Sequence, residues 1–320
     1  MGILNSDKIN ERFKKKMASL TVIAPPKDDP ISLTDPDNIR FSAAIWSDLH
    51  FSAIYEHNRT QSCRISLEDL SASQVQLDAL LIAGDLCENG KMAEKEYLAE
   101  QLQSIKTVKT VLPASGNHDV RLRHIENSIK KFSAFCNKVN SDLLPDKMYY
   151  SREVNGYKII ILGTTRSAFE ESHLDDEEME WLKNELRSGT ANGKPVFVIA
   201  HQPLQFTHNL PNSWDTPGNK RKGSIGKQSE HLKNILNGYK NVFFITGHLH
   251  RGFNINTYEE IMNFHSVNAP STGVWNKDSV YSGAGLGFIL EVYDSFVLFR
   301  PRDFMSGKFI PEYNKKYSIL

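Results

Sequence analysis

The chain has 320 residues, 38 of them basic and 38 acidic, so its formal net charge at pH 7 is zero. This balance excludes a strong overall field that would draw the protein to nucleic acid or an anionic membrane, and we expect no nucleic-acid partner. No run approaches the ~20 apolar residues that a membrane-spanning helix requires, and the chain does not start with a signal-peptide pattern.

The three cysteines, Cys63, Cys87 and Cys136, are odd in number, widely spaced and not arranged as a Cys-x-x-Cys pair. This usage is typical of reduced thiols rather than of a disulfide framework. Together with the lack of a signal-peptide pattern, it predicts a cytoplasmic protein without a membrane span.

Residues 1–40 are predicted to form an N-terminal arm or cap, because Pro25-Pro26 and two Asp-Pro steps break regular structure there. The first six residues, Met-Gly-Ile-Leu-Asn-Ser, match an N-myristoylation signal, and nearby lysines would add a membrane contact. So short a pattern also arises by chance, and lipidation of Gly2 stays open.

From Phe41 onward, short apolar runs alternate with amphipathic stretches, which predicts an α/β domain over 41–300 and a C-terminal tail over 301–320. A hairpin is expected to turn at Asn155-Gly156. In chain order, the predicted elements are strands at 41–46 and 77–83, a helix at 91–105, a strand at 108–112, a helix at 121–137, hairpin strands at 148–154 and 158–163, a helix at 175–186, strands at 196–200 and 242–246, and strand-like sequence from 255 to about 300.

Five polar motifs follow the predicted apolar runs. They are Asp48-Leu-His50, Gly84-Asp85, Gly116-Asn117-His118-Asp119, His201 and Gly247-His248-Leu249-His250. Strand ends can gather at one rim of a sheet, where open α/β folds place their ligand sites. Asp48 and His50 are two residues apart, so in a continuing strand both would face the same way. Glycine before Asp85, Asn117 and His248 fits tight turns and a close approach of the backbone to a ligand.

A single motif of this kind would carry little weight, because a lone histidine is usually structural and Gly-Asn is a common turn pair. The ordered set offers carboxylates, imidazoles and one amide, without a thiolate. These are ligands that two neighbouring divalent ions accept. The sequence therefore predicts a two-metal enzyme acting on a phosphate ester.

These motifs resemble the pattern of the calcineurin-like metallophosphoesterase family: Asp-x-His, Gly-Asp, Gly-Asn-His-Asp/Glu, His and Gly-His-x-His. Every position is filled between Asp48 and His250. The resemblance implies a four-layer α/β/β/α sandwich of two mixed sheets flanked by helices, with residues 41–300 as the catalytic domain.

The resemblance also implies a role for each motif residue. One metal would be held by Asp48, His50, Asp85 and His250, and the second by Asp85, Asn117, His201 and His248, with Asp85 bridging the two. Hydrolysis would proceed by a metal-bridging hydroxide. His118 would act as general acid or phosphate contact, and Asp119 would orient its ring and raise its basicity. These ligand types suit Mn, Fe or Zn and do not choose among them.

The segment Gly84-Asp-Leu-Cys-Glu-Asn-Gly90 separates the chain from two branches of the family. Purple acid phosphatases carry a Tyr at the position of Glu88, and protein Ser/Thr phosphatases carry Asp-Arg-Gly. The segment resembles the Gly-Asp-Leu-Thr-x-Asp-Gly of class III cyclic-nucleotide phosphodiesterases, although His201-Gln202-Pro203 departs from their usual His-His-Pro. The implied substrate is a small phosphodiester such as a cyclic nucleotide.

Residues 205–228 are the expected substrate-selecting loop. They include His208, Trp214 and Arg221, which could stack on a base or screen a phosphate. Arg121, just after the third motif, could also contact phosphate. A solvated loop and a helix-surface arginine are equally compatible with the sequence.

Other functions share the same ligand set. A phosphomonoesterase and a nucleotide-sugar or dinucleotide pyrophosphatase both remain alternatives. A nuclease is disfavoured because balanced charge gives little backbone-binding surface. A non-catalytic scaffold on the same fold would be expected to have lost ligands, and none is missing here.

Overall fold

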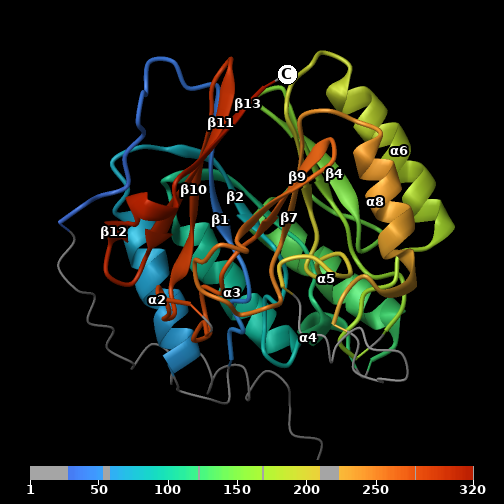
Figure 1. Ribbon diagram of the computed structural model, residues 1–320. Helices are drawn as coiled ribbons and strands as arrows, with labels where there is room; N and C mark the ends of the chain where they lie inside the picture. The colour runs from blue at the N-terminus through green and yellow to red at the C-terminus, as the bar shows by residue number, and fades with distance from the viewer. Residues whose placement is uncertain are drawn as a thin grey trace, which may run out of the picture.

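Two β-sheets pack face to face, and helices cover the outer face of each sheet (Figure 1). The predicted four-layer α/β/β/α sandwich is therefore confirmed. The computed structural model describes residues 28–52, 58–121, 123–167, 169–209, 223–277 and 279–319.

The first sheet has the strand order β12-β11-β10-β1-β2-β3, with β13 paired to β11. The β1, β2 and β3 strands are parallel, whereas β10 to β13 pair in antiparallel fashion. The strands are β1 (Phe41–Trp46), β2 (Leu77–Ile82), β3 (Val108–Pro113), β10 (Leu286–Val292), β11 (Phe296–Asp303), β12 (Lys308–Phe309) and β13 (Lys315–Ser318).

The second sheet has the order β4-β5-β6-β7-β9-β8. Its four central strands are parallel, and β4 and β8 are antiparallel strands at its edges. The strands are β4 (Tyr150–Val154), β5 (Tyr157–Ile161), β6 (Val196–Ile199), β7 (Val242–Thr246), β8 (Tyr258–Ile261) and β9 (Phe264–Asn268).

Helices α2, α3 and α5 pack on the first sheet, and α6 and α8 pack on the second. The short α4 carries the third motif. The helical bounds are α2 (Asn58–Ser71), α3 (Met92–Ser104), α4 (Asn117–Val120), α5 (Ile125–Val139), α6 (Asp176–Thr190) and α8 (Ser229–Asn237), with 3₁₀ turns η1 (Gly226–Gln228) and η2 (Pro311–Tyr313).

The central strands β5, β6 and β7 of the second sheet are buried on both faces, which explains why they read as nearly continuous apolar runs. Successive side chains of β5 alternate between two cores. Ile159 and Ile161 belong to the core between the sheets, whereas Ile160 and Leu162 lie in the core under α6 and α8. The Asn155-Gly156 turn of the β4–β5 hairpin has φ of 50° and 74°, the left-handed pair that a type I′ turn requires.

Three helices, α2, α4 and α8, were not predicted, and one predicted helix begins later than expected. The buried face of α2 mixes apolar residues such as Cys63 and Leu67 with polar ones such as Thr60, Ser62 and Ser66, which weakens its periodicity. The four residues of α4 and the nine of α8 were too short for their periodicity to be recognised. The helix expected at 121–137 is α5, which begins at Ile125 after an extended His124.

The described residues before 41 and after 300 pack into the domain, whereas the sequence predicted an arm and a tail. The expected boundary at residue 300 falls inside β11, and β12 and β13 complete the first sheet. In the described part of the arm, Ile31 is fully buried and the Thr34 N–H donates to Glu291. Residues 1–6, with the myristoylation pattern, lie outside the described residues. No described helix is long and apolar enough to cross a membrane.

A buried ion pair joins β11 to α2 and generates a stability prediction. Arg302 donates from Nε and Nη2 to the Asp69 carboxylate over 2.7 and 2.9 Å, and both side chains are buried. We expect Asp69→Ala to lower the free energy of unfolding by about 3–5 kcal/mol, because it leaves the guanidinium buried and uncompensated. Urea denaturation measures this change.

The matched control is the exposed pair of Arg40 and Asp294, which has a similar two-bond geometry. Asp294→Ala should leave stability close to that of the wild type, because solvent screens the pair. Equal unfolding midpoints for the two variants would contradict the importance of the buried pair.

Candidate metal centre

All seven predicted ligand residues follow the carboxyl ends of strands in the two sheets. Three strands of the first sheet, β1, β2 and β3, and two of the second, β6 and β7, point their ends to one rim. The structure therefore brings together residues that are far apart in the sequence. These residues are Asp48, His50, Asp85, Asn117, His201, His248 and His250.

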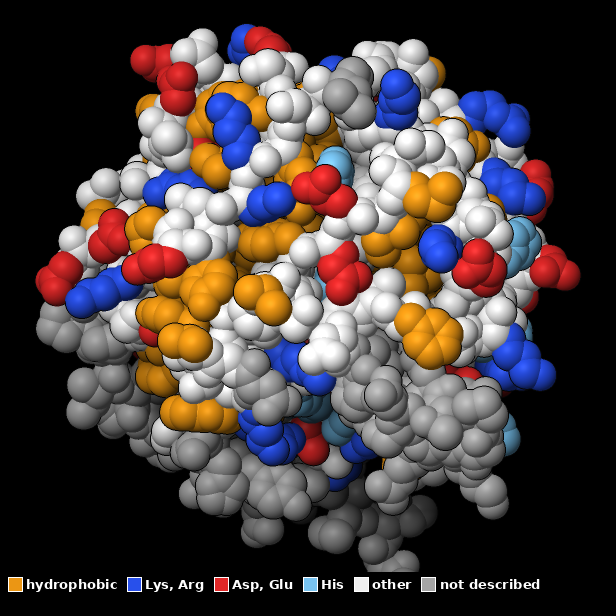
Figure 2. All heavy atoms as spheres, in the orientation of Figure 1, with side chains coloured by type: hydrophobic (Ala, Val, Ile, Leu, Met, Phe, Trp, Pro, Cys, Tyr) orange, Lys and Arg blue, Asp and Glu red, His pale blue; other side chains and the backbone are white. Residues whose placement is uncertain are grey.

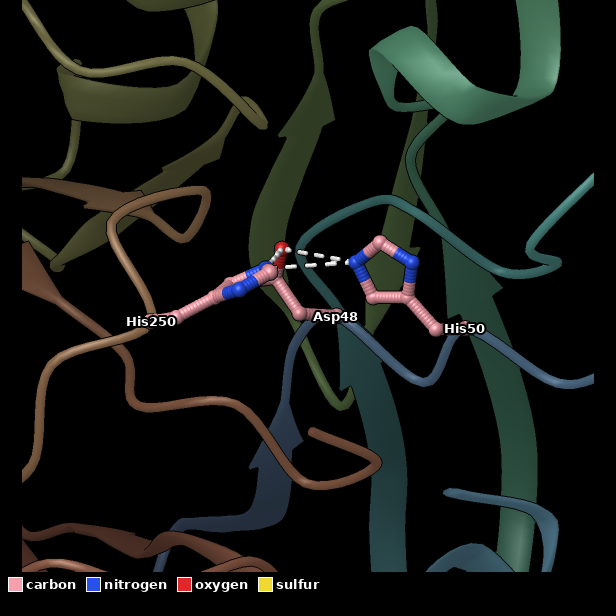
Figure 3. A group of neighbouring side chains, drawn as sticks. All are labelled: Asp48, His50 and His250. Carbon is pink, nitrogen blue, oxygen red and sulfur yellow. Dashed lines mark hydrogen bonds and ion pairs between the residues drawn. The ribbon is translucent and has the colours of Figure 1, made fainter. Parts of the chain in front are cut away.

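Asp48 lies between two imidazoles in the first cluster (Figure 3). Its Oδ1 atom is 2.9 Å from His250 Nε2 and 3.7 Å from His50 Nε2. The two Nε2 atoms are themselves 3.2 Å apart. One ligand atom from each of these residues can therefore face a single ion.

Asp85, His201 and His248 form the second cluster. His201 Nε2 is 3.1 Å from both the Asn117 amide oxygen and His248 Nδ1. Asp85 Oδ2 is 3.3 Å from His201 Nε2 and also 3.3 Å from His50 Nε2 in the first cluster. Asp85 thus lies between the two groups, where a bridging ligand would have to be.

The backbone reaches this arrangement through left-handed residues, not through continuing strands. The expectation that Asp48 and His50 face one way because a strand continues is wrong. The N–H of each still bonds the loop after β2, donating to the carbonyls of Gly84 and Asp85 over 3.0 and 2.9 Å. Positive φ at non-glycine residues is uncommon and clusters at functional sites. The φ values are 51° at Asp48, 43° at His50, 50° at Asp85, 72° at His248 and 48° at His250.

The motif glycines allow this close packing. A Cβ on Gly116 would lie 2.1 Å from Asp85 Oδ1, and one on Gly247 would lie 1.7 Å from Ser47 Oγ. The φ of Gly116 is −111°, so space and not backbone conformation requires glycine there. The group that these two glycines approach is the neighbouring loop, whereas the prediction was a close approach of the backbone to a ligand.

Opposite charges stabilise each other in this buried site. Burial disfavours charge on Asp48 and Asp85, yet the histidines hold the pKa of both carboxyls well below the ordinary range. Burial lowers the pKa of His50, but Asp48 and Glu88 outweigh it and raise this pKa to about 10. Asp85 and Asp48 likewise outweigh burial at His201 and raise its pKa to about 9.

His118 lies beside the first cluster, with its ring 4.4 Å from that of His50. Its Nδ1 is 2.7 Å from the Glu88 carbonyl oxygen, and burial lowers its pKa. The prediction that Asp119 orients this ring and raises its basicity is therefore wrong. Asp119 is buried beside Lys95, and it accepts hydrogen bonds from the N–H groups of Gly116 and Leu86 over 3.0 and 3.1 Å. It ties the loops after β2 and β3 together.

Two further carboxylates contact the ligands. Glu88 Oε2 accepts a hydrogen bond from His50 Nδ1 over 2.7 Å and pairs with Arg59, and its pKa falls to about 2. Glu170 Oε2 accepts from the Asn117 amide nitrogen over 2.9 Å, which leaves the amide oxygen facing His201. In the sequence, Glu88 was noted only because purple acid phosphatases carry a Tyr at this position. Glu170 belongs to no motif and was not predicted.

The structure describes two of the four candidate substrate residues, Arg121 and His208. Arg121 lies 3.9 Å from Glu170 and over the Phe169 ring, near the metal cluster. His208 is buried, and its two ring nitrogens bond the Asn256 carbonyl and the Ser266 hydroxyl, each over 2.7 Å. It is a packing residue, so the prediction for His208 is wrong. Trp214 and Arg221 lie outside the described residues.

A cavity of about 490 Å³ opens onto the clusters. Figure 2 shows histidine side chains in the lower part of the molecule, with basic and acidic side chains beside them. The described residues that line the cavity are His50, Arg59, Asp85, Glu88, Asn117, His118, Glu170, His248, Leu249, His250, Val274, Trp275 and Lys277. Nitrogen and oxygen ligands converging on such a cavity fit a pair of divalent ions.

A family model for calcineurin-like phosphoesterases matches residues 41–252, a span that includes all five motifs. Fold, site and match together define a phosphoester hydrolase. The chain belongs to the calcineurin-like phosphoesterase family, as its motifs predicted.

Two curated relatives are named for their activity. The chain is 23% identical over 242 residues to a 3′,5′-cyclic-nucleotide phosphodiesterase of Nostoc sp., covering 74% of this chain and 80% of that protein. It is 25% identical over 138 residues to a probable cyclic nucleotide phosphodiesterase of Fibrobacter succinogenes, covering 43% of this chain and 47% of that protein.

Two solved structures share the fold. A purple acid phosphatase from yellow lupin has a TM-score of 0.57 at 16% identity, covering 87% of this chain and 53% of that one. A dimetal phosphatase from Danio rerio has a TM-score of 0.57 at 10% identity, covering 88% of this chain and 100% of that one. At these identities the likeness is one of fold.

The space at Gly116 generates a test of the site geometry. We expect Gly116→Ala to weaken metal binding about 10- to 100-fold, the range seen when support of a ligand is lost. Its Cβ would lie 2.3 Å from the Asp85 backbone nitrogen and would displace the loop. Elemental analysis after reconstitution measures the bound metal. Gly193→Ala is the control, because its Cβ meets nothing within 4 Å and its φ of 73° makes it report the cost of backbone strain without displacing the Asp85 loop. Wild-type metal content in Gly116→Ala would contradict the model of a tightly packed site.

The raised pKa values predict that metal ions displace protons. At pH 7 the metal-free site holds a proton on His50 and on His201, whose pKa values are about 10 and about 9. Metal binding should release about two protons, and affinity should rise with pH. Calorimetry in buffers of different ionisation enthalpy counts these protons. The number should fall as the pH approaches 9, and binding without any buffer dependence would refute the prediction.

Proposed function

We propose that this protein is a binuclear-metal phosphodiesterase that hydrolyses a small phosphodiester such as a cyclic nucleotide. The observation that carries the proposal is the position of Asp85, 3.3 Å from a ligand nitrogen in each cluster. The names of the two curated relatives support the choice of a cyclic phosphodiester. The site belongs to a unit that starts near residue 41 and includes the strands after residue 300.

Each cluster would hold one ion, with Asp85 shared between them. The first ion would have Asp48, His50, Asp85 and His250 as ligands, and the second would have Asp85, Asn117, His201 and His248. When bound, two such ions lower the pKa of a water molecule and neutralise charge on the phosphate. Mn, Fe and Zn all fit these ligand types.

The chain's own residues hold this arrangement and move a proton. Glu88 bonds Nδ1 of His50 and so fixes the ring with Nε2 towards the site. Because the Glu88 carbonyl oxygen can only accept, Nδ1 of His118 carries a proton. Nε2 of His118 is then the atom that exchanges a proton with the leaving oxygen, as a general acid does.

Related reactions need the same ligands, so a phosphomonoesterase and a nucleotide-sugar or dinucleotide pyrophosphatase are the alternatives. A panel of cyclic nucleotides, phosphomonoesters, nucleotide sugars and dinucleotides, assayed with Mn²⁺, separates them. We expect the diesters to be hydrolysed faster than the monoesters. A strong monoester preference would overturn the proposal, and metal-loaded protein without activity would favour a scaffold.

Two substitutions separate metal binding from proton transfer. Asp85→Ala should abolish activity and the binding of at least one ion, because it removes the shared ligand. His118→Ala should keep both ions and lower turnover about 10²–10⁴-fold, the range for loss of a general acid. Elemental analysis and steady-state kinetics measure the two effects. His231→Ala, an exposed histidine of α8, is the control. Loss of both ions from His118→Ala would refute this division of roles.

A further inference from the structure

The loop after β9, residues 271–277, is bonded directly to the backbone of the metal-binding loops. The Gly273 N–H and the Ser271 hydroxyl donate to the Asp48 carbonyl over 3.1 and 2.8 Å. The Lys277 N–H donates to the His250 carbonyl over 2.9 Å. The position of this loop is therefore fixed by two of the proposed ligands themselves.

The loop is also braced internally by Asn276, whose side chain is fully buried. Its amide oxygen accepts from the Ser271 N–H over 2.7 Å, and its amide nitrogen donates to the Ser271 carbonyl over 2.8 Å. A Cβ on Gly273 would lie 1.8 Å from the Leu49 carbonyl oxygen, so the loop packs tightly on the first motif. Side chains on this loop are held by a rigid backbone.

Trp275 extends from this braced loop into the solvent at the mouth of the cavity. Its side chain is 64% exposed, whereas Trp46 is fully buried in the core. Of the described residues that line the cavity, Trp275 alone carries an apolar ring. Exposed apolar residues elsewhere, such as Ile255 and Val280, do not line it. A large exposed ring on a braced backbone beside the candidate metal centre is an arrangement that suits stacking on a flat ligand.

We propose that Trp275 is a stacking subsite for the base of a nucleotide, so that the substrate of the metal centre is a phosphodiester that carries a flat aromatic heterocycle. The inference rests on the proposed function and names its substrate class. Arg59 and Lys277 also line the cavity, and Arg59 pairs with Glu88. Lys277 forms no ion pair within the described part of the chain, so its ammonium is the basic group of the lining that can face a phosphate. Phosphate at the clusters and base on Trp275 would occupy both ends of one cavity.

The test compares two cyclic diesters that differ only in the base. One is adenosine 3′,5′-cyclic monophosphate, and the other is 1-O-methyl-ribose 3,5-cyclic phosphate, which has the same reacting ring without a base. With Mn²⁺-loaded wild type, kcat/KM should be about 10-fold or more higher for the nucleotide, consistent with stacking on one aromatic side chain. Trp275→Ala should remove most of that preference by raising KM with kcat little changed, because it removes uniform binding.

Two further variants make the result specific. Trp275→Phe retains a stacking face and should keep most of the preference. Phe206→Ala removes an aromatic side chain that is 83% exposed and does not line the cavity. This variant should leave kcat/KM for both substrates unchanged. Binding of adenosine 5′-monophosphate, measured by calorimetry, should weaken about 10-fold in Trp275→Ala.

The outcomes separate this inference from the proposed function. If the wild type hydrolyses neither cyclic diester, the proposed function fails. The stacking subsite is then tested separately, by comparing the binding of adenosine 5′-monophosphate to the wild type and to Trp275→Ala. If both diesters are hydrolysed but Trp275→Ala affects them equally or not at all, the subsite fails while the phosphodiesterase stands. Unchanged binding of the monophosphate in Trp275→Ala would also overturn the subsite.

Discussion

The burial of Asp48 and Asp85 is the constraint on which the rest of the site depends. Both carboxylates are at most 1% exposed, and charges so far from water cost several kcal/mol each unless positive charge faces them. His50, His201 and His250 lie against them, and the carboxylates raise the pKa values of His50 and His201 despite burial. Two divalent ions would supply the same positive charge more strongly. One buried negative pair therefore accounts for the imidazoles, the left-handed turns that place them and the glycines that leave room.

The fold and the clustering of the candidate ligand residues were predictable because their signals are local. An apolar run followed at once by Asp, His or Gly-Asn marks a strand end, and five such marks in order located the candidate site. The left-handed backbone at Asp48 and His250 was not predictable, because Asp and His adopt it more often than most residues but no pattern in the sequence required it. Asp119 was assigned to His118 because the two are adjacent in sequence. In the structure its partners, Leu86 and Lys95, come from the loop after β2 and from α3.

The residues that could contact a substrate were also hard to predict, because their positions depend on partners that are distant in the sequence. Local composition drew attention to residues 205–228, where aromatic and basic residues are close in sequence. His208 instead fills a buried gap between Asn256 and Ser266. The residue that reaches the cavity, Trp275, comes from a loop whose sequence is ordinary and whose place is set by bonds to Asp48 and His250. One of these partners, Asp48, is 223 residues from Ser271 in the chain, so local sequence could not reveal the position of Trp275.

The pairing of β1 with β10 has a consequence for the order of assembly. Phe41 is aligned with Val292 and Ile45 with Phe288, so the centre of the first sheet joins the two ends of the chain. Neither β1 nor its loop can gain this neighbour until Val292 has been synthesised. Contacts so distant in sequence slow folding and expose unpaired strand edges meanwhile. A nascent chain without β10 would therefore lack a finished pocket, and cation loading would follow the synthesis of that strand.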